Sequence, residues 1–503
     1  MTDVGSTESR NTDVGSTESR NTGVGSTESK NTDVGSTEPR SAGAPSTPKR
    51  FIDRDEIARV HDEAEKLEPG EEGAETRRLA GRVMARRDMG KLVFLDLVDR
   101  SGRIQLLAPE ARTGPIDVHL GDVVGAVGKP TKSRRGEPSL ILDELVLLSR
   151  NRSPLPDTHH GLTDIEQRYR RRYLDLLMNE GTRADFMLRA RIVTAIRRFL
   201  DVEGFVEVET PILQPRYGGA FAEPFVTHHN ELDQDLYLRI ATELYLKRLI
   251  VGGLEKVYEI GKDFRNEGVN YKRNPEFTML EWYEAYVDYQ DTMRRMENLI
   301  EYVAQETLGT TTTTFKGHEI DVKAPWKRVR LVDELKELDL WTKDSADLRQ
   351  RLQSRSVDVS NDETWSQLVD KAVNAYIEPR LIEPTILYDY PIELSPFARM
   401  TDDDPEIVER FEFYVGGMEL GNAFTELNDA EEQAQRFAMQ AEEGAGGNVE
   451  AEQGDPDYVE ALSYGMPPTG GLGLGIDRLA MVLAGKDSIR DVILFPAQRA
   501  KNE

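Results

Sequence analysis

Residues 264–289 bring cationic, aromatic and acidic side chains together in one stretch, FRNEGVNYKRNPEFTMLEWYEAYVDY. The second half of this stretch reads as a strand, in which alternate side chains share a face. That alternation places Phe277, Glu281 and Tyr283 on one face. We expect this face to offer a small ligand an aromatic plate, a carboxylate and a phenol.

The cations of this stretch lie before that strand, around a long loop. Arg265 stands at the edge of the outgoing strand, and Lys272 and Arg273 lie in the loop. A guanidinium can bind a phosphate through two parallel hydrogen bonds, and the loop cations would hold the far end of a polyphosphate. The hairpin therefore predicts a nucleoside triphosphate site. The alternative is a solvated hairpin held by salt bridges.

A second hairpin is predicted in FEFYVGGMELGNAFTELNDAEEQ, residues 411–433. If Gly416 and Gly417 form a two-residue turn, Glu412 and Glu419 lie diagonally on the same face. No opposite charge is expected between these two carboxylates, and such a pair is costly unless a hard divalent cation binds it. Mg²⁺ bridging phosphate oxygens fits that requirement. An ordinary acidic hairpin is the alternative.

Further candidates for substrate contacts lie on either side of these hairpins. Asn422 and Glu426 share a face by alternation, provided that Gly421 marks a β-bulge that resets the register. Earlier in the chain, YGGAFAEPF contains a glycine turn at Gly219, and ATELYLKRLIVGG places Glu243 at the start of a helix. Glycine turns are common, so these last two are weak signals when they are taken alone.

The segment GGLGLGIDRLAMVL, residues 470–483, lacks both GxGxxG spacing and the lysine of a Walker loop. Its glycines at alternate positions are Gly471, Gly473 and Gly475. They leave one strand face without side chains, so a flat ligand could lie against the backbone. Arg478 follows in the first helical turn, where its guanidinium could stack on a base from the side opposite Phe277.

The elements that position these residues fall into three parts. Residues 1–50 contain four copies of one decapeptide without a periodic apolar set, so a disordered tail is expected. An N-terminal helix and a small β-domain are expected over 51–152, and a larger α+β domain over 153–503. Within the larger domain, residues 292–375 are expected to form a mostly helical insertion.

The small β-domain is predicted from five short β-patterned runs between residues 79 and 148. Five strands in about 70 residues predict a barrel of the kind that stacks nucleic-acid bases on exposed aromatic rings. The basic loop KPTKSRRGEP, residues 129–138, would lie at the rim of this barrel. A purely structural β-domain is the alternative.

Composition limits the possible partners. The chain has 91 acidic and 64 basic residues, a formal net charge of −27, so contact with nucleic acid must involve a local basic patch. This acidic excess also suggests a salt-rich cytoplasm. Cysteine is absent, which excludes disulfides and thiolate metal sites. No apolar run approaches the roughly 18 residues of a membrane span, and we expect a cytoplasmic protein.

Taken together, these segments resemble the class II aminoacyl-tRNA synthetases, and specifically the lysyl-tRNA synthetases. GFVEVETPIL is similar to the first motif of that family, FRNEG with NPEFTMLEWYEAY to the second, and GLGLGIDR to the third. The similarity runs from about Leu79 to the C-terminus. It implies an OB-fold anticodon-binding barrel, an antiparallel catalytic sheet flanked by helices, and a homodimer. The implied reaction joins lysine to tRNA with ATP and Mg²⁺.

The resemblance also implies a role for each candidate residue. Lysine would be bound by Gly219, Glu243, Arg265, Glu281, Tyr283, Asn422 and Glu426. ATP would be bound by Arg265, Glu267, Arg273, Phe277, Glu412, Glu419, Gly475 and Arg478. Among these, Arg265 and Arg478 would be catalytic, and Glu412 and Glu419 would hold Mg²⁺. Phe94 and Gln105 would read the anticodon.

Two positions depart from the family pattern. Arg273 stands where histidine is usual, and Glu223 stands where a basic residue is usual. Two other functions compete with the ligase. A shortened paralogue that modifies elongation factor P lacks the N-terminal barrel, and an inactive RNA-binding paralogue usually loses a motif arginine. This chain has the barrel pattern and retains both Arg265 and Arg478, which favours the ligase.

Overall fold

The computed structural model describes residues 47–156, 161–220, 222–360, 364–445 and 454–499. The decapeptide repeats, and with them almost all of the tail expected over 1–50, lie outside the described residues. The chain forms two compact units that divide between Leu155 and Pro156. Within the described ranges, no helix is both long enough and apolar enough to cross a membrane.

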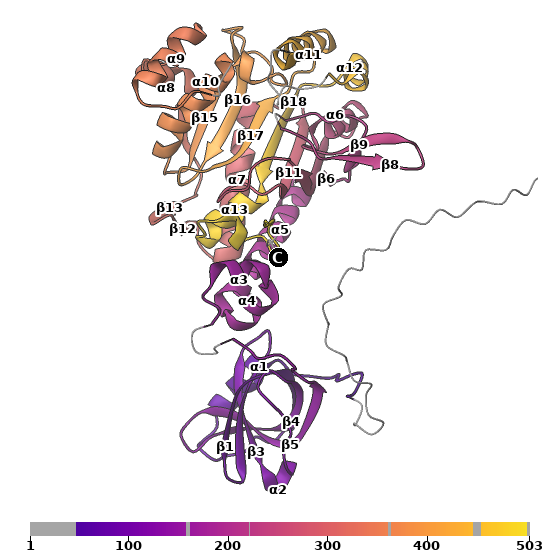
Figure 1. The fold of residues 1–503 in the computed structure, drawn as a ribbon, viewed down its shortest axis with the longest axis vertical. Helices are drawn as coiled ribbons and strands as arrows, with labels where there is room; N and C mark the ends of the chain where they lie inside the picture. Colours follow the sequence, from indigo (N-terminus) through magenta and orange to yellow (C-terminus); the bar gives the residue numbers. More distant parts are fainter. Residues whose placement is uncertain (1–46, 157–160, 221, 361–363, 446–453, 500–503) are drawn as a thin grey trace, which may run out of the picture. The chain divides into compact units, whose positions relative to one another are not determined.

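The first unit is a closed five-stranded barrel with the strand order β1-β2-β3-β5-β4 (Figure 1). Its elements are α1 (Ile57–Glu65), β1 (Arg77–Met89), β2 (Leu92–Val98), β3 (Arg103–Pro109), α2 (Glu110–Thr113), β4 (Val123–Lys132) and β5 (Pro138–Ser149). Alternate side chains such as Leu95 and Leu97 point inward and are fully buried, and α1 adds Ile57 and Val60 to the same core. The barrel predicted from the five β-patterned runs is confirmed.

The second unit is built on an eight-stranded sheet with the order β14-β15-β16-β17-β18-β11-β10-β6. The strands, in that order, are Lys327–Arg330, Thr385–Pro391, Ile407–Tyr414, Glu419–Thr425, Thr469–Gly475, Glu276–Ala285, Lys256–Phe264 and Val206–Glu207. The central pairs are antiparallel, whereas the outer strands β6 and β14 pair in parallel with their neighbours. The predicted α+β class with a largely antiparallel sheet is therefore confirmed.

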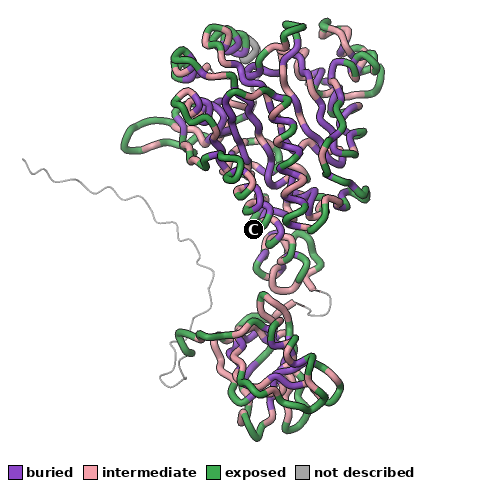
Figure 2. The backbone as a smooth tube through the Cα atoms, turned by 180° about the vertical axis from the view of Figure 1, so that it is seen from behind, coloured by how far each residue is buried: buried purple, intermediate pink, exposed green. Residues whose placement is uncertain are grey.

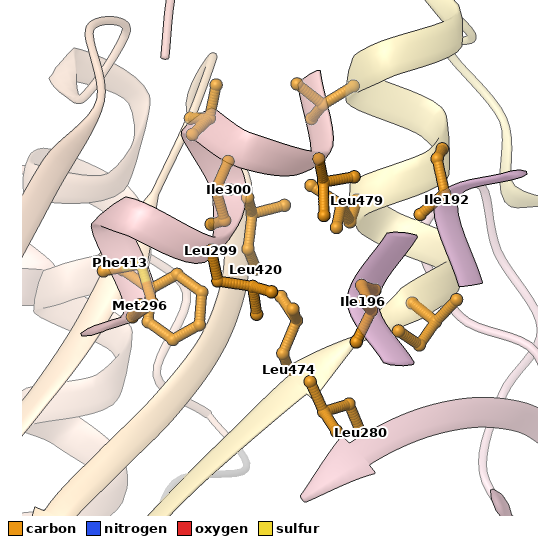
Figure 3. Close-up of a cluster of buried hydrophobic side chains, with 14 of the residues drawn as sticks. Ile192, Ile196, Leu280, Met296, Leu299, Ile300, Phe413, Leu420, Leu474 and Leu479 are labelled. Carbon is orange, nitrogen blue, oxygen red and sulfur yellow. The ribbon is translucent and has the colours of Figure 1, made fainter. Parts of the chain in front are cut away.

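One face of this sheet is covered by three helices, α5 (Glu180–Val202), α7 (Tyr289–Leu308) and α13 (Ile476–Ala484). Figure 3 shows Leu280, Leu420 and Leu474 of the sheet packed among apolar side chains of these helices. Because side chains alternate along a strand, the neighbours of these leucines point to the opposite face. That opposite face is left for the polar and aromatic residues of the candidate site.

Of the remaining helices of this unit, α3 and α4 lie together beyond the sheet, next to α5, and the others lie around the sheet (Figure 1). They are α3 (Ile165–Arg170), α4 (Arg172–Met178), α6 (Glu243–Val251), α8 (Leu331–Glu337), α9 (Ser345–Ser354), α10 (Trp365–Ala372), α11 (Ala430–Ala445) and α12 (Pro456–Ser463). Two small sheets are formed by β7 (Leu213–Gln214), β8 (Val226–His229) and β9 (Gln234–Leu238), and by β12 (Thr312–Phe315) and β13 (His318–Asp321). In Figure 2 the buried stretches follow the strands and the helices packed on them, within each unit.

The range 292–375 differs from the helical insertion expected there. Helix α7 starts at Tyr289, and residues such as Met296 and Ile300 belong to the main core. The range also contains β12, β13 and β14, and β14 is the outer strand of the central sheet. Only α8, α9 and α10 form a separate helical cluster, which packs beside β15. Within GFVEVETPIL, the strand β6 spans only Val206–Glu207.

Candidate active site

A cavity of about 350 Å³ lies over β11, β17 and β18. It is lined by every site residue assigned to the larger domain from the sequence, namely Gly219, Glu243, Arg265, Glu267, Arg273, Phe277, Glu281, Tyr283, Glu412, Glu419, Asn422, Glu426, Gly475 and Arg478. These residues come from segments far apart in the chain. The sheet register brings them together, with Glu281 of β11 opposite Gly473 of β18, and Gly473 opposite Asn422 of β17.

Arg265 is the cation of the site that lacks an acidic partner. Its guanidinium lies over the Phe277 ring, 5.1 Å from the ring centroid. Its Nε is buried, and its side chain makes no hydrogen bond or ion pair with any residue that the structure describes. A buried donor without a partner is costly, so this guanidinium is prepared for an anionic ligand.

The two loop cations are already paired. Lys272 Nζ lies 2.8 Å from a carboxylate oxygen of Glu378, and Arg273 Nη1 lies 3.1 Å from Glu267. An exposed ion pair such as Arg273–Glu267 contributes little to stability and can rearrange around a ligand. The hairpin therefore presents one unpaired guanidinium and two paired cations to the cavity, of which Arg273 is the more exposed.

The turn between β16 and β17 has the geometry predicted from its sequence. Gly416 and Gly417 have φ values of 61° and 64°, which favour glycine at both turn positions. Tyr414 then stands opposite Glu419, and a bulge follows before Gly421 pairs with Phe413. The predicted two-residue turn, and a bulge beside Gly421, are confirmed.

The charges around Glu412 and Glu419 differ from the prediction, because each carboxylate has its own arginine. Arg410 Nη2 lies 2.6 Å from Glu412, and Arg478 Nη1 lies 2.9 Å from Glu419. Tyr414 also donates its hydroxyl to Glu412. Burial would raise the pKa of Glu419, but the Arg478 guanidinium outweighs burial and lowers it. The expectation that no opposite charge accompanies these carboxylates was wrong.

Arg410 was missed in the sequence, although it contacts two predicted site residues. Its guanidinium donates to Asn422 Oδ1 at 3.0 Å and to Glu412, and it also bonds the Leu394 carbonyl oxygen at 2.6 Å. Arg410 and Glu412 are two residues apart on β16, so they share a face. This spacing of two residues could have identified Arg410 as a site residue from the sequence. Arg410 fixes the orientation of the Asn422 amide toward the cavity.

The inner end of the cavity is acidic and closed. Glu281 is buried, and its carboxylate accepts hydrogen bonds of 3.4 Å from the Thr242 backbone N–H and from the Tyr283 hydroxyl. Burial, together with the nearby Asp263 and Glu243 carboxylates, raises the pKa of Glu281 to about 8. Glu281 has no cationic partner in the described part of the chain. A cationic group is therefore the ligand that this end of the cavity fits.

A fully buried lysine, Lys247 of α6, was also missed in the sequence. Its Nζ lies 2.6 Å from Glu243 and contacts Glu426. Burial lowers the pKa of this ammonium, but Glu243 and Glu426 outweigh burial, so the net shift is upward and Lys247 is charged. The i,i+4 spacing of Glu243 and Lys247 was visible in the sequence. The contact with Glu426 was not, because it joins distant parts of the chain.

Gly471 on β18 explains how the inner end is closed. A Cβ atom at this position would lie 2.0 Å from Glu426 Oε1 and 2.5 Å from the Tyr283 ring. Glu426 and Tyr283 therefore lie directly on the glycine backbone. The strand has no side chain on this face at Gly471, as expected. The side chains of Glu426 and Tyr283, and not a ligand, lie against the backbone there. Gly219 has φ +87° and lies directly against Glu243, because a Cβ atom at Gly219 would be 3.0 Å from Glu243 Cβ.

In the barrel, Phe94 and Gln105 lie on the outer face, on neighbouring strands β2 and β3. The Arg87 guanidinium lies 5.4 Å from the Phe94 ring centroid. Gln105 Oε1 accepts a hydrogen bond of 3.2 Å from the Ser139 hydroxyl. This half-buried patch combines an aromatic face, an amide and a cation, which is a suitable composition for stacking single-stranded bases.

Comparisons with known proteins agree with this geometry. Residues 164–499 match the family described as tRNA synthetases class II (D, K and N), and residues 78–148 match the OB-fold nucleic acid binding domain. The chain belongs to the class II tRNA synthetases. The match to this synthetase family begins before α3 and ends near the last described residue, so it includes the whole cavity.

Similar proteins indicate a narrower group within the class II synthetases. It is 48% identical over 438 residues to a protein named lysine–tRNA ligase from Carboxydothermus hydrogenoformans, covering 85% of this chain and 90% of the relative. It is 48% identical over 433 residues to the lysine–tRNA ligase of Bacillus subtilis, with 84% and 87% covered. For the lysine–tRNA ligase of Roseiflexus, the identity is 49% over 443 residues, with 84% and 89% covered.

Within the described ranges, this synthetase has no cluster of three or more His, Cys, Asp or Glu side chains that could hold a metal ion alone. Glu412 and Glu419 both line the cavity and supply carboxylate oxygens, which Mg²⁺ prefers. A magnesium ion here would need further oxygen ligands from a phosphate or from water. The residues present therefore fit a metal that arrives with a nucleotide.

Proposed function

We propose that this chain is a lysine–tRNA ligase, which activates lysine with ATP to form lysyl-adenylate and pyrophosphate and then transfers lysine to the 3′ end of tRNA. The observation that carries this proposal is the buried Glu281 carboxylate without a cationic partner in the described chain, beside the Tyr283 hydroxyl. An acidic substrate would require a cation at that place instead. The names of the curated relatives support the same substrate.

Lysine would lie with its side chain in the acidic inner end. Glu281, Tyr283 and Glu426 would hold the side-chain ammonium, while Glu243 and the Gly219 backbone would hold the α-amino group. Arg265 and Asn422 would hold the carboxylate of lysine. This arrangement leaves that carboxylate beside the one unpaired guanidinium of the site, where it can approach the α-phosphate of ATP.

ATP would bind at the outer part of the cavity. Adenine would lie between Phe277 and Arg478, with Glu267 beside the adenine or ribose. The triphosphate would lie along Arg265 and Arg273. Mg²⁺ would be held by Glu412, Glu419 and phosphate oxygens, once these carboxylates share their charge with the metal. Bound Mg²⁺ would supply charge neutralisation for the departing pyrophosphate.

Catalysis in this site would consist of positioning and charge stabilisation. The lysine carboxylate attacks the α-phosphorus in line, the bond to the bridging oxygen breaks, and pyrophosphate leaves. Arg265 would neutralise negative charge that builds up on the α-phosphate oxygens. No protein nucleophile is needed, because the substrate carboxylate forms the new bond.

Lysine-dependent exchange of pyrophosphate into ATP tests this function directly. We expect exchange with lysine and none above background with aspartate or asparagine, followed by transfer of labelled lysine to tRNA. Exchange with aspartate, or no exchange with lysine in a folded protein, would contradict the proposal. Because the charge of the chain suggests a salt-rich cytoplasm, the assay should be repeated from low to molar salt.

The raised pKa of Glu281 predicts how lysine binding depends on pH. Below about pH 8 the free carboxyl is largely protonated, and binding of an ammonium requires loss of that proton. The KM for lysine should therefore fall as pH rises towards 8, by at most about tenfold per unit, and then level off. Steady-state exchange at saturating ATP measures this profile, and a KM that is flat from pH 6 to 8 would contradict it.

The barrel would bind the anticodon of tRNA through Phe94 and Gln105. Replacing Phe94 with alanine removes the half-buried ring and should weaken tRNA binding by about 1–3 kcal/mol, which is the usual contribution of one stacked base. Amino acid activation takes place in the other unit, so lysine-dependent exchange should be unchanged. A filter-binding assay with tRNA and the exchange assay separate these effects, and equal losses in both would argue against the assignment.

We also propose that the chain forms a homodimer through its first motif, in the cytoplasm, where protein synthesis occurs. Several large apolar side chains near this motif are exposed in the single chain. They are Val202, Val206, Ile212, Leu213, Val226 and Leu232. A second copy of the chain would cover such a patch in a symmetric interface. Light scattering of the purified protein measures its mass in solution.

A further inference from the structure

Three carboxylates line the inner end of the cavity, and one ammonium of the described part of the chain contacts them. Glu243, Glu281 and Glu426 are all buried, and Lys247 supplies the ammonium. Lys247 Nζ contacts both Glu243 and Glu426, whereas Glu281 is held only by the hydrogen bonds from Thr242 and Tyr283. The charges therefore do not balance once Glu281 is deprotonated, and this carboxylate without a cation is the one on the strand face that lines the cavity.

Lys247 is completely buried, so its charge lies inside the folded protein. Its ammonium lies 4.9 Å from the Phe397 ring centroid, 5.9 Å from that of Tyr283 and 6.0 Å from that of Tyr458. Aromatic faces stabilise a cation, and desolvation strengthens the effect. The rings also keep water away from the two ion pairs. A substrate ammonium cannot replace Lys247 without leaving this ammonium buried and unpaired.

The two ion pairs also restrict how Glu243 and Glu426 can meet a ligand. Lys247 takes Oε1 of Glu243 and Oε2 of Glu426. The other oxygen of Glu426 lies over Gly471, where a Cβ would be only 2.0 Å away. Each glutamate is thus held in one orientation with part of its negative charge already neutralised. Glu281 alone retains a full negative charge for the substrate when it is deprotonated.

We propose that Lys247 is a specificity-determining positioning residue: its internal ammonium neutralises Glu243 and Glu426, so that Glu281 is left as the counter-charge for one substrate ammonium. This inference rests on the proposed lysine–tRNA ligase function and deepens it. The site then selects an amino acid with a single side-chain cation through its charge balance as well as its shape. Lys247 would touch no reacting atom and would act through the two glutamates.

Several titratable and charged groups face this ammonium or its partners. From α6 they are Glu243 and Arg248, from β11 Glu281 and Tyr283, after β17 Glu426, and from α12 Tyr458; beside Glu281 lie Glu259 and Asp263 of β10, which are both paired with the buried Arg239. Burial raises the pKa of Glu426, and Lys247 opposes that effect. Without Lys247, the carboxyl of Glu426 should take up a proton more readily.

The test replaces Lys247 with methionine, which keeps the length of the side chain and removes its charge. We expect the KM for lysine to rise at least about tenfold at neutral pH, with a change in the KM for ATP below about twofold. The KM for lysine should also depend on pH more steeply than in the wild type, because more than one carboxyl must now lose a proton. The wild-type protein is assayed in parallel: failure of its lysine-dependent exchange would overturn the proposed function, not this inference.

A double variant and a matched control separate charge balance from loss of packing. Lys247→Met with Glu426→Gln restores the wild-type net charge of the pocket, so its pH profile should return to that of the wild type and its Tm should exceed that of the single variant. Arg248→Met breaks the neighbouring ion pair with Asp455, outside the cavity, and should lower Tm without changing the KM for lysine. An unchanged KM and pH profile for folded Lys247→Met would overturn the inference.

If the methionine variants do not fold, a crystal structure of the wild-type protein with lysine decides the question. We expect Lys247 Nζ to remain within hydrogen-bond distance of Glu243 and Glu426, and the substrate ammonium to lie on Glu281. A structure in which Lys247 has left both glutamates to make room for the substrate would overturn the inference.

Discussion

Glu281→Gln should reduce kcat/KM for lysine by about 100- to 1000-fold while ATP still binds. Loss of one partner from a buried charge pair costs about 2–5 kcal/mol, and each 1.4 kcal/mol corresponds to about tenfold in an equilibrium constant. In the variant, the substrate ammonium would be buried against a neutral amide, and the other two carboxylates nearby are already paired with Lys247. Lysine-dependent exchange gives kcat/KM, and fluorescence titration gives the affinity for ATP.

Thermal unfolding separates this loss from misfolding. The pKa of Glu281 is raised by folding, so the folded state binds an extra proton between the ordinary carboxyl pKa and about 8, and stability from this group falls as pH rises through that range. Glutamine removes the effect, so Tm at neutral pH should not decrease. Glu276→Gln, at the exposed start of the same strand, is the control and should leave both kinetic constants unchanged. Equal loss of lysine and ATP binding in Glu281→Gln would contradict the specificity role.

The parts of the fold that were predicted correctly are those with a local signal. The five barrel strands and the alternation along β11 follow from the period of two in strand side chains. The Gly416–Gly417 turn follows from the backbone conformations that only glycine adopts easily. By contrast, β14 joins the sheet by pairing with β15, whose residues lie far along the chain. No local pattern indicates such pairing, so the residue range predicted for the helical insertion was too long.

For a related reason, the residues that line the candidate site were predicted better than the contacts between them. The residue types of the cavity lining were visible in the motifs, but the roles given to them came from the family resemblance and remain proposals. The partners of those residues were harder to predict. Arg410 and Glu412 share a strand face, so that ion pair could have been found from the spacing. The contact between Lys247 and Glu426 joins a helix to a distant strand end, and only the folded chain reveals it.

Arg265→Ala should reduce kcat/KM for adenylate formation by about 10³-fold, or about 4 kcal/mol. This size is typical for removal of one preorganised donor to an oxyanion. The structure makes the prediction specific, because the Arg265 side chain forms no ion pair or hydrogen bond with any described residue, and its guanidinium lies over the Phe277 ring. The folded protein therefore loses little, while the transition state loses its main cation at the α-phosphate. Single-turnover formation of lysyl-adenylate measures the effect.

Arg273→Ala is the matched control for this prediction, since Arg273 comes from the same hairpin and is half exposed in an ion pair with Glu267. It should raise the KM for ATP by less than about tenfold, because a screened, exposed cation contributes at most about 1 kcal/mol. Tm should change little in either variant. If Arg273→Ala were as damaging as Arg265→Ala, the unpaired guanidinium would not be the group that distinguishes the transition state, and the phosphate would have to bind along the loop instead.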